Sequence, residues 1–312
     1  MNLYLSVVIP FYNSLFYLKK NFYFISNLKN IPRVEILFID DCSLDKSSNW
    51  LVKNFSSPNI KFYKTKKNSG PGVARNIGLA KASGKKLLFL DADDSLSIKN
   101  LKLLLEYIGK KNFNILNFGK KYLNSSKKQQ KPFNNLSRIN NIKKFFLKPS
   151  EKEVIGFLFD INFLKKNKIF FKKGIFEDIL FLFKTLFFNN KKIFFFKKMI
   201  YLKSNNKNSI TNNFSLLHIK FMIRAWFDVL IFIKKKIKNK DFKNLDKYVQ
   251  YRFRGLMFDD FKKIQRFILN KKNKDFMIQA LVKSYKKILK KNYTCLTNKD
   301  HVVKSLINNR SY

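Results

Sequence analysis

The sequence predicts an α/β fold in which a mostly parallel sheet carries helices on both faces. Short apolar runs with the length of buried strands lie at 5–10, 34–40, 60–64, 85–91 and 113–118. Segments with one apolar helical face alternate with these runs, at about 14–28, 44–54, 72–82 and 97–109. Fully apolar strands separated by amphipathic helices are typical of a parallel sheet that is covered on both sides.

The remainder of the chain divides into three stretches. Residues 119–150 are rich in Lys, Asn and Ser, which indicates an insert or a mobile loop. Short apolar runs return between 151 and 212, and beyond 213 the pattern is helical. We therefore predict a main domain over 1–212 and a basic, mainly α-helical C-terminal extension over 213–312.

The composition indicates a folded and strongly basic protein. Of 312 residues, 46% are hydrophobic, and the formal net charge is +45. Such a charge favours a polyanionic partner, either nucleic acid or anionic lipid. The charge is not confined to one tail, however, because residues 213–312 carry 25 Lys and Arg against 7 Asp. A joint excess of Lys, Asn, Ile and Phe is typical of AT-rich coding, so nucleic acid is not the expected partner.

Cysteine, histidine and hydropathy argue against several classes of protein. The chain has two residues of each type, Cys42, Cys295, His218 and His301. Their number and spacing fit neither a disulfide scaffold nor a zinc site. No signal peptide is expected, because a strand is already predicted at 5–10. The most apolar late segment, 221–233, is broken by Arg224 and Asp228 and is too short to span a bilayer. We expect a cytoplasmic protein.

Carboxylates gather where the predicted strands end. Asp40 and Asp41 follow the second strand, and Asp91, Asp93 and Asp94 follow the fourth. Ligands bind beyond the carboxyl ends of strands in such sheets. Clustered carboxylates repel and raise one another's pKa, whereas Mg²⁺ and Mn²⁺ favour oxygen ligands. For "DADD" alone two interpretations stay open, a divalent-metal site and a solvated acidic turn that caps the next helix.

A glycine-rich segment, "NSGPGVARN", precedes another predicted helix. Gly70 and Gly72 lie at the start of this helix, and Arg75 lies in its first turn. Backbone N–H groups at a helix start, together with an Arg, suit a diphosphate. A plain turn followed by a helix with an exposed Arg explains the segment equally well.

A later helix begins with a pair of acids. "GIFEDILFLF" places Glu177 and Asp178 at the start of a strongly apolar stretch. Acidic side chains in a first helical turn interact favourably with the helix dipole. On its own, the segment therefore indicates a capped helix.

The order and spacing of these segments resemble a known family. The series "SVVIPFYN", "VEILFIDDCSLD", "NSGPGVARNIGLAKASGKKLLFLDADD" and "FEDILF" resembles the family 2 inverting glycosyltransferases with the GT-A fold, of the bacterial surface-polysaccharide type. The resemblance implies a Rossmann-like nucleotide-diphospho-sugar transferase fold. Its nucleotide-sugar-binding half would be 1–118, and its acceptor and catalytic-base half would be 151–212. The resemblance is strong over about 3–110, moderate over about 154–212 and absent beyond 213.

The resemblance also implies an activity. The protein would transfer a sugar from a nucleoside-diphosphate sugar, expected to be a UDP-sugar, to a hydroxyl of a glycan or a lipid-linked acceptor. It would use Mn²⁺ or Mg²⁺. The donor nucleotide would be bound by Pro10, Tyr12, Asp40, Asp41, Arg75, Asp91, Asp93 and Lys203.

Within this set, the resemblance gives most residues a place. Pro10 and Tyr12 would line the base pocket, and Asp41, with Asp40 beside it, would accept a hydrogen bond from the base imide. Arg75 would lie against the diphosphate. Lys203 belongs to "YLKSNNKNSIT", which resembles a segment that often closes over the diphosphate.

The metal and the base follow from the same resemblance. Asp93 and Asp94 would hold the metal, and which of these two and Asp91 binds it directly stays open. Asp178 would be the catalytic base, with Glu177 as its neighbour.

The chain departs from the family pattern at several positions. Cys42 stands where the family usually has Gly, Leu15 replaces a commonly acidic residue, and "EVIGFLFD" lacks a Trp that is often found there. These departures bear on the donor and acceptor pockets and leave the metal and base assignments unchanged.

The alternative function comes from a different class. It is a non-catalytic basic protein that docks on anionic membrane or nucleic acid. In a weaker, compatible version the enzyme contacts the membrane peripherally, through Lys-rich helices at 234–240 and 283–291.

Overall fold

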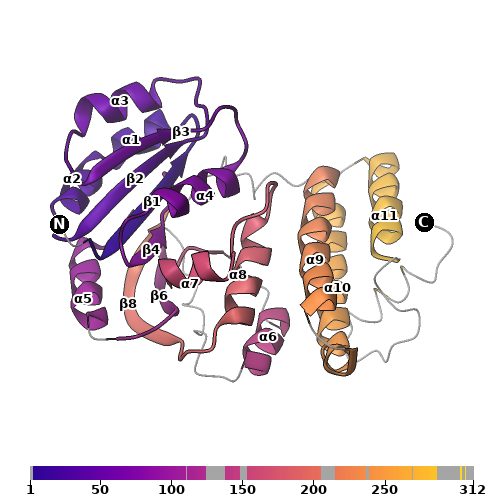
Figure 1. Ribbon diagram of the computed structural model, residues 1–312. Helices are drawn as coiled ribbons and strands as arrows, with labels where there is room; N and C mark the ends of the chain where they lie inside the picture. The colour runs from indigo at the N-terminus through magenta and orange to yellow at the C-terminus, as the bar shows by residue number, and fades with distance from the viewer. Residues whose placement is uncertain are drawn as a thin grey trace. The chain divides into compact units, whose positions relative to one another are not determined.

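Figure 1 shows the protein as a computed structural model. The structure describes residues 3–109, 111–123, 138–147, 153–204, 215–236, 239–268 and 270–286, together with Val303 and Leu306. The chain divides into two compact units, which are described separately. The first comprises Met1–Asn141 and Lys152–Asn206, and the second comprises Ile142–Glu151 and Lys207–Tyr312.

The first unit is built on an eight-stranded sheet in the order β3-β2-β1-β4-β7-β6-β8-β5. Its strands are β1 (Leu5–Phe11), β2 (Val34–Asp40), β3 (Ile60–Lys64), β4 (Lys86–Phe89), β5 (Ser95–Leu96), β6 (Ile115–Tyr122), β7 (Phe157–Asp160) and β8 (Phe194–Lys203). The neighbours β3, β2, β1 and β4 run parallel, as do β6 and β8, whereas β7 is antiparallel to β4 and β6, and β5 to β8. The predicted α/β fold is confirmed, with its antiparallel strands in the second half of the sheet.

Helices cover both faces of this sheet. They are α1 (Leu15–Lys20), α2 (Phe22–Lys29), α3 (Ser47–Asn54), α4 (Pro71–Lys81), α5 (Ile98–Ile108), α7 (Ile161–Lys166) and α8 (Glu177–Phe188). On one face, Ile9 of β1 shares an apolar core with Ile25 of α2 and Leu104 of α5. On the other face, Val8 meets Gly78 of α4, where an added Cβ would lie 2.3 Å from Val8 Cγ1. Strand β1 is buried along its whole length because helices pack on both of its sides.

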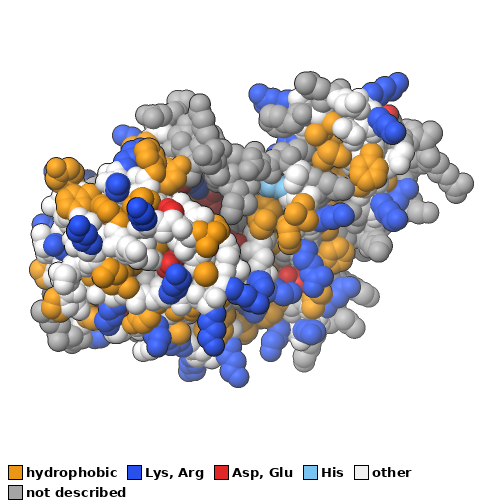
Figure 2. Space-filling view, turned by 90° about the horizontal axis from the view of Figure 1, so that it is seen from above, with side chains coloured by type: hydrophobic (Ala, Val, Ile, Leu, Met, Phe, Trp, Pro, Cys, Tyr) orange, Lys and Arg blue, Asp and Glu red, His pale blue; other side chains and the backbone are white. Residues whose placement is uncertain are grey.

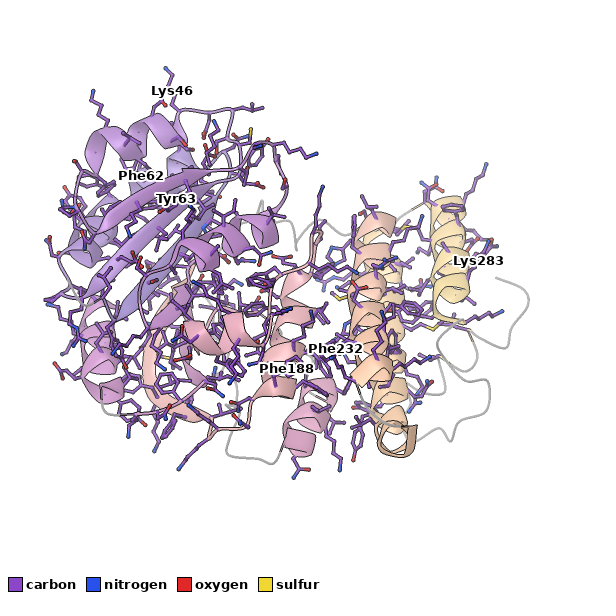
Figure 3. All side chains as sticks on the ribbon, viewed as in Figure 1. Lys46, Phe62, Tyr63, Phe188, Phe232 and Lys283 are labelled. Atoms are coloured by element: carbon purple, nitrogen blue, oxygen red, sulfur yellow. The ribbon has the colours of Figure 1, made fainter. Side chains whose placement is uncertain are left out.

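Aromatic packing supports the ends of the first three strands. Phe62 of β3, labelled in Figure 3, lies in the edge strand of the sheet. Its ring stacks on Phe38 of β2 with centroids 5.6 Å apart, and Phe38 meets Phe11 of β1 at 6.4 Å. Just beyond these rings, the backbone N–H of Asp41 donates to the carbonyl of Phe11 at 2.8 Å. The residues that follow β1 and β2 are therefore held side by side at one edge of the sheet.

The helix predicted over 14–28 is interrupted, and α1 and α2 meet at Asn21. The amide of Asn21 donates to the carbonyls of Ala92 at 3.1 Å and Asp94 at 3.0 Å. An Asn side chain readily bonds to nearby backbone groups, and here it bonds to a turn distant in sequence. The interruption therefore supports the turn after β4, where three aspartates lie.

The second unit is mainly helical, as the sequence predicts for the C-terminal region. Its helices are the greater part of α6 (Arg138–Leu147), α9 (Leu216–Lys236), α10 (Asn239–Phe267) and α11 (Lys271–Lys286). Trp226 of α9 packs on Phe145, Phe146 and Phe253, with ring centroids 5.6, 5.8 and 6.2 Å apart. Over the described ranges, no helix combines the length and the apolar character needed to cross a membrane.

Candidate active site

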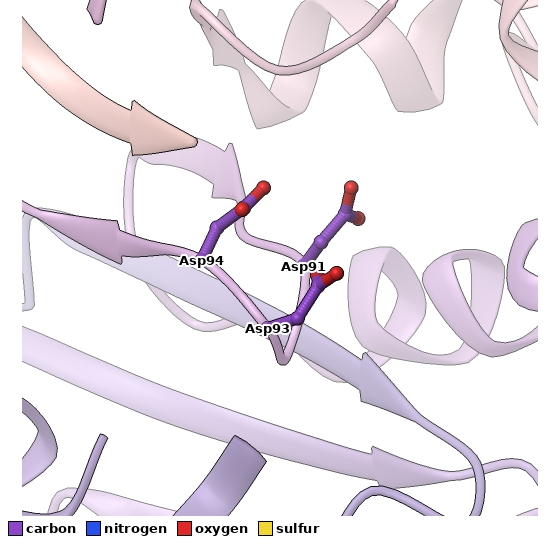
Figure 4. Close-up of side chains that lie close together, drawn as sticks. All are labelled: Asp91, Asp93 and Asp94. Carbon is purple, nitrogen blue, oxygen red and sulfur yellow. The ribbon is translucent and has the colours of Figure 1, made fainter. Parts of the chain in front are cut away.

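Three aspartates cluster in the turn that follows β4 (Figure 4). Asp91, Asp93 and Asp94 each offer a carboxylate oxygen within 4.8 Å of the others. The turn is closed by the N–H of Asp94, which donates to the carbonyl of Asp91 at 3.0 Å. The chain then enters the short strand β5, so the three side chains are fixed between two strands of the sheet.

Asp94 is the buried member of this cluster, and protein donors reach both of its oxygens. The hydroxyl of Tyr201 donates to Oδ2 and the N–H of Ser204 donates to Oδ1, each at 2.6 Å. Burial, and then repulsion from Asp91 and Asp93, raises the pKa of Asp94 to about 7. A metal ion that bound Asp94 would therefore share its oxygens with Tyr201 and Ser204.

The donor set of this cluster fits a hard divalent cation. All three side chains offer carboxylate oxygens, the ligand type that Mg²⁺ and Mn²⁺ favour. The raised pKa of Asp94 arises in part from Asp91 and Asp93, and a bound cation would relieve that repulsion. The chemistry of the cluster is thus compatible with the predicted metal.

Arg75, the fifth residue of α4, joins the cluster to the start of α8. Its guanidinium donates to Asp91 Oδ1 at 2.8 Å, to Glu177 Oε1 at 2.5 Å and to Asp178 Oδ1 at 3.2 Å. Burial alone would lower the pKa of Arg75, but the surrounding carboxylates raise it well above its ordinary value. Arg75 is only 6% exposed, so the interpretation as an exposed surface Arg is wrong. Its expected contact with a diphosphate stays a prediction.

Glycines allow α4 to approach the segment before α8 closely. A Cβ at position 72 would lie 2.8 Å from Cγ of Glu177 and 3.1 Å from the carbonyl oxygen of Lys172. Gly70 has φ +89°, a conformation that favours glycine, and no atom within 4 Å of an added Cβ. Gly72 is thus needed for close packing against Glu177, and Gly70 for its backbone conformation.

Asp178 is held by α4 and by the segment before β7. Besides Arg75, the N–H of Val154 donates to its Oδ2 at 2.9 Å. Burial raises the pKa of Asp178 to about 7, Arg75 opposes this rise, and Glu177 adds to it. A carboxylate with a pKa near neutrality is suited to general-base chemistry at neutral pH. Glu177 and Asp178 also bind Arg75, in addition to lying in the first turn of α8, and the role of Asp178 as a base stays a prediction.

The aspartates after β2 hold loops of the protein. Both oxygens of Asp41 are engaged by the N–H of Gly70 at 2.7 Å, the N–H of Ser69 at 3.0 Å and the hydroxyl of Thr65 at 3.0 Å. Asp40 accepts from the N–H of Ser43 at 2.7 Å, and from the hydroxyl of Ser48. A hydrogen bond from a nucleotide base to Asp41 would add to these contacts, and it stays a prediction.

The other predicted donor residues lie in two places. Pro10 is buried within β1, and Tyr12, just after β1, is 41% exposed. Lys203 ends β8, and its ammonium donates to Oε1 of Glu153 at 2.9 Å. Pro10 and Tyr12 thus lie at the strand ends beside Asp40 and Asp41, whereas Lys203 lies next to Ser204 and hence near Asp94.

Several residues of this network carried no signal in the sequence. Tyr201 lies in the apolar run "FFFKKMIYLK", where it is indistinguishable from a core residue. Glu153 follows the polar stretch that we interpreted as an insert. Asn21 lies inside a predicted helix. Their contacts join residues far apart in the chain, which local patterns do not report.

Residues 6–172 match the sequence model of the family described as glycosyl transferase family 2. An uncharacterized glycosyltransferase of Haemophilus influenzae is 35% identical over 106 residues, which are 33% of this chain and 42% of that protein. The poly(ribitol-phosphate) beta-N-acetylglucosaminyltransferase TarS of Staphylococcus aureus is 32% identical over 114 residues, 36% of this chain and 20% of TarS. The matched segment thus spans less than half of either relative.

Solved structures share the fold. Residues 1–349 of S. aureus TarS in complex with UDP-GlcNAc superpose with a TM-score of 0.69 and 19% identity, covering 98% of this chain and 88% of that chain. The mannosyltransferase PcManGT of Pyrobaculum calidifontis, in complex with GDP-Man and Mn²⁺, gives a TM-score of 0.57 at 11% identity, over 97% of this chain and 83% of that chain.

Proposed function

Because this chain belongs to glycosyl transferase family 2, we propose that it is an inverting, metal-dependent glycosyltransferase. It transfers a sugar from a nucleoside-diphosphate sugar to a hydroxyl of a glycan or a lipid-linked acceptor. The TarS complex with UDP-GlcNAc supports a UDP-sugar as donor and an N-acetylhexosamine as one candidate sugar. The activity named for TarS, on poly(ribitol-phosphate), supports a polymer as acceptor, and the family resemblance adds a role in surface-polysaccharide synthesis.

The observation that carries this proposal is the position of Arg75 between Asp91 and Asp178. Its hydrogen bonds of 2.8 and 3.2 Å link the acidic turn after β4 to the first turn of α8. A glycosyltransferase needs a charge-stabilising site and a base close to one another, because the acceptor attacks the carbon that the diphosphate leaves. The network of Arg75 supports such an arrangement.

The proposed mechanism assigns a task to each part of the site. A divalent cation held by Asp93, with Asp91 and Asp94, would neutralise charge on the departing nucleoside diphosphate. Asp178 accepts the proton of the acceptor hydroxyl as that oxygen attacks the anomeric carbon. Attack on the face opposite the leaving group inverts the configuration in one displacement. Pro10, Tyr12 and Asp41 bind the nucleotide base of the donor. Arg75 and Lys203 lie beside the diphosphate of the donor.

We propose a cytoplasmic location, where nucleotide sugars are made. The proposed partners are the sugar donor, the acceptor and an anionic membrane surface. Lysine-rich segments near 234–240 and 283–291 support peripheral contact with such a surface. In Figure 2, however, Lys and Arg side chains are scattered among apolar and neutral side chains on the face in view. A purely basic docking protein would also leave the buried network around Arg75 without a purpose.

The proposal is tested with the full chain, a panel of UDP- and dTDP-sugars, and Mn²⁺. We expect metal-dependent release of the nucleoside diphosphate with at least one donor. Asp178→Asn is expected to bind that donor normally and to lose transfer. Absence of both turnover and donor binding across the panel would overturn the proposal, and a fully active Asp178→Asn variant would remove Asp178 from the role of base.

A further inference from the structure

Glu153 lies between two lysines at the edge of the candidate site. Its Oε1 accepts from the ammonium of Lys203 at 2.9 Å, and its Oε2 accepts from the ammonium of Lys120 at 3.4 Å. Burial raises the pKa of Glu153, but the two lysines outweigh this and lower it, so the carboxylate is charged. The lysines come from the neighbouring strands β6 and β8. Glu153 therefore joins two strands through ion pairs.

Lys203 has a second set of acidic neighbours. Burial alone would lower the pKa of Lys203, but the charge of Glu153 outweighs this and raises it, and Asp91 and Asp94 add to the rise. The next residue, Ser204, donates its N–H to Asp94, which keeps the end of β8 beside the acidic turn. The ammonium of Lys203 is thus paired with Glu153 and also lies in the electrostatic field of Asp91 and Asp94.

Glu153 and the aspartates therefore attract the same positive charge, the ammonium of Lys203. An ammonium that moved onto Asp91 or Asp94 would neutralise the carboxylates that a divalent metal needs, and its positive charge would repel the metal. The ion pair with Glu153 is only partly exposed, with side-chain exposures of 26% for Lys203 and 40% for Glu153, so it is incompletely screened by water.

We propose that Glu153 is a positioning residue that holds the ammonium of Lys203 away from the cluster of Asp91, Asp93 and Asp94, and thereby keeps that cluster available to a divalent cation. The inference rests on the proposed function only in assigning the cation to this cluster. It assigns a task to a residue for which the family resemblance gave none.

The test measures binding of Mn²⁺ alone to the full-length chain, from the electron paramagnetic resonance signal of free Mn²⁺. In Glu153→Gln, Lys203 loses its anionic partner, and we expect Mn²⁺ affinity to fall about tenfold, the effect of a single nearby charge. Removing the ammonium as well, in the double variant Glu153→Gln/Lys203→Gln, is expected to restore the affinity of the unmodified chain.

Lys120 supplies the matched control, because it pairs with the same carboxylate. Glu153→Gln/Lys120→Gln has the same net charge as the other double variant, yet it leaves Lys203 able to reach the aspartates. We expect it to keep the weakened affinity. A second control, Asp160→Asn, removes the charge from another 2.9 Å ion pair, with Lys86, and is expected to leave Mn²⁺ affinity unchanged.

Two results would overturn the role of Glu153 and leave the proposed function intact. One is unchanged Mn²⁺ affinity in Glu153→Gln while Asp93→Asn abolishes binding. The other is equal recovery in both double variants, which would mean that only net charge matters. Absence of Mn²⁺ binding by the unmodified chain would instead overturn the metal site itself, and this inference with it. Thermal melting of each variant identifies any that fails to fold.

Discussion

The hydroxyl of Tyr201 donates to Oδ2 of Asp94 at 2.6 Å across 107 positions of sequence. The hydroxyl oxygen of Tyr201 in turn accepts a hydrogen bond from the N–H of Asp91 at 3.2 Å. Burial and the two aspartates raise the pKa of Tyr201 well above its ordinary value, so its hydroxyl keeps its proton. Strand β8 therefore holds both ends of the acidic turn through one phenol group.

Replacing Tyr201 by Phe is expected to lower the free energy of unfolding by about 1–3 kcal/mol, because it leaves the buried carboxylate of Asp94 and the N–H of Asp91 short of a partner. Urea unfolding at pH 8 measures the change. Tyr4→Phe is the matched control, because its hydroxyl makes a single bond, to the carbonyl of Ile108 at 3.1 Å. A loss no larger than that of Tyr4→Phe would show that the double contact of Tyr201 has no special weight.

Sequence patterns predicted the part of this protein whose structure depends on neighbours in the chain. The strands β1 to β4 and the aspartates after β2 and β4 lie where apolar runs and their ends indicate. Arg75 was predicted to be functional, but its bond to Glu177 spans 102 positions, and helical spacing contains no information about such a partner. The contacts of Glu153 and Tyr201 were missed for the same reason, since they arise only when distant strands pair.

Activity is expected to rise with pH through about 7. Asp178 has a pKa of about 7 and acts as a base only without its proton, so kcat/KM falls as the pH is lowered through that value. Arg75 opposes the rise of this pKa, and Arg75→Gln is therefore expected to move the pH profile to higher pH, in addition to lowering the rate. Profiles measured between pH 5 and 9 decide this, and an Arg75→Gln profile shifted to lower pH would contradict it.

Stability is expected to change with pH in the opposite sense. The pKa values of Asp94 and Asp178 are raised to about 7 in the folded protein, above their ordinary value of 3.8. The folded state therefore holds these protons more tightly than the unfolded state. Their contribution to the free energy of unfolding is greatest below pH 3.8 and falls as the pH rises towards 7.

Asp94→Asn removes one of these titrating groups and keeps a side chain of the same size. Thermal melting between pH 5 and 8 is expected to show a smaller decrease in stability for this variant than for the unmodified chain. Mn²⁺ is expected to stabilise the unmodified chain more at pH 8 than at pH 5, because the cation binds ionised carboxylates. A stabilisation by Mn²⁺ that does not depend on pH would argue against carboxylate ligands.

Two glycines of α4 are expected to respond differently to substitution by Ala. At Gly78 the added Cβ would lie 2.3 Å from Val8 Cγ1 in the core, so Gly78→Ala is expected to cost about 1–3 kcal/mol of stability. At Gly72 the added Cβ would lie 2.8 Å from Cγ of Glu177 and would displace that side chain. The shift would disturb Asp178, the proposed catalytic base, which is the next residue in the chain. Transfer is expected to fall by about 100-fold in Gly72→Ala, because small misplacements of catalytic groups are costly.

Urea unfolding and the transfer rate, measured on both variants, separate these effects. Gly255→Ala is the control, because an added Cβ there meets no atom within 4 Å. In the helix α10 that change is expected to stabilise the protein by up to about 1 kcal/mol. If the loss of transfer rate relative to the loss of stability were the same in Gly72→Ala as in Gly78→Ala, the packing of Gly72 against Glu177 would have no separate role in the site.

Cys42 occupies a left-handed backbone conformation, with φ +66°, between Asp41 and Ser43. This accounts for the glycine that the family resemblance leads one to expect at this position, because a side chain in that conformation costs about 1–2 kcal/mol. Glycine also gains freedom in the unfolded chain, which offsets about 0.4–1 kcal/mol of the benefit. We therefore expect Cys42→Gly to raise the free energy of unfolding by up to about 1 kcal/mol.

Cys42→Val, with a β-branched side chain, is expected to lower the free energy of unfolding by about 1–3 kcal/mol. Urea unfolding of both variants is the measurement, and a Val variant as stable as the Gly variant would mean that the loop after β2 relaxes to another conformation.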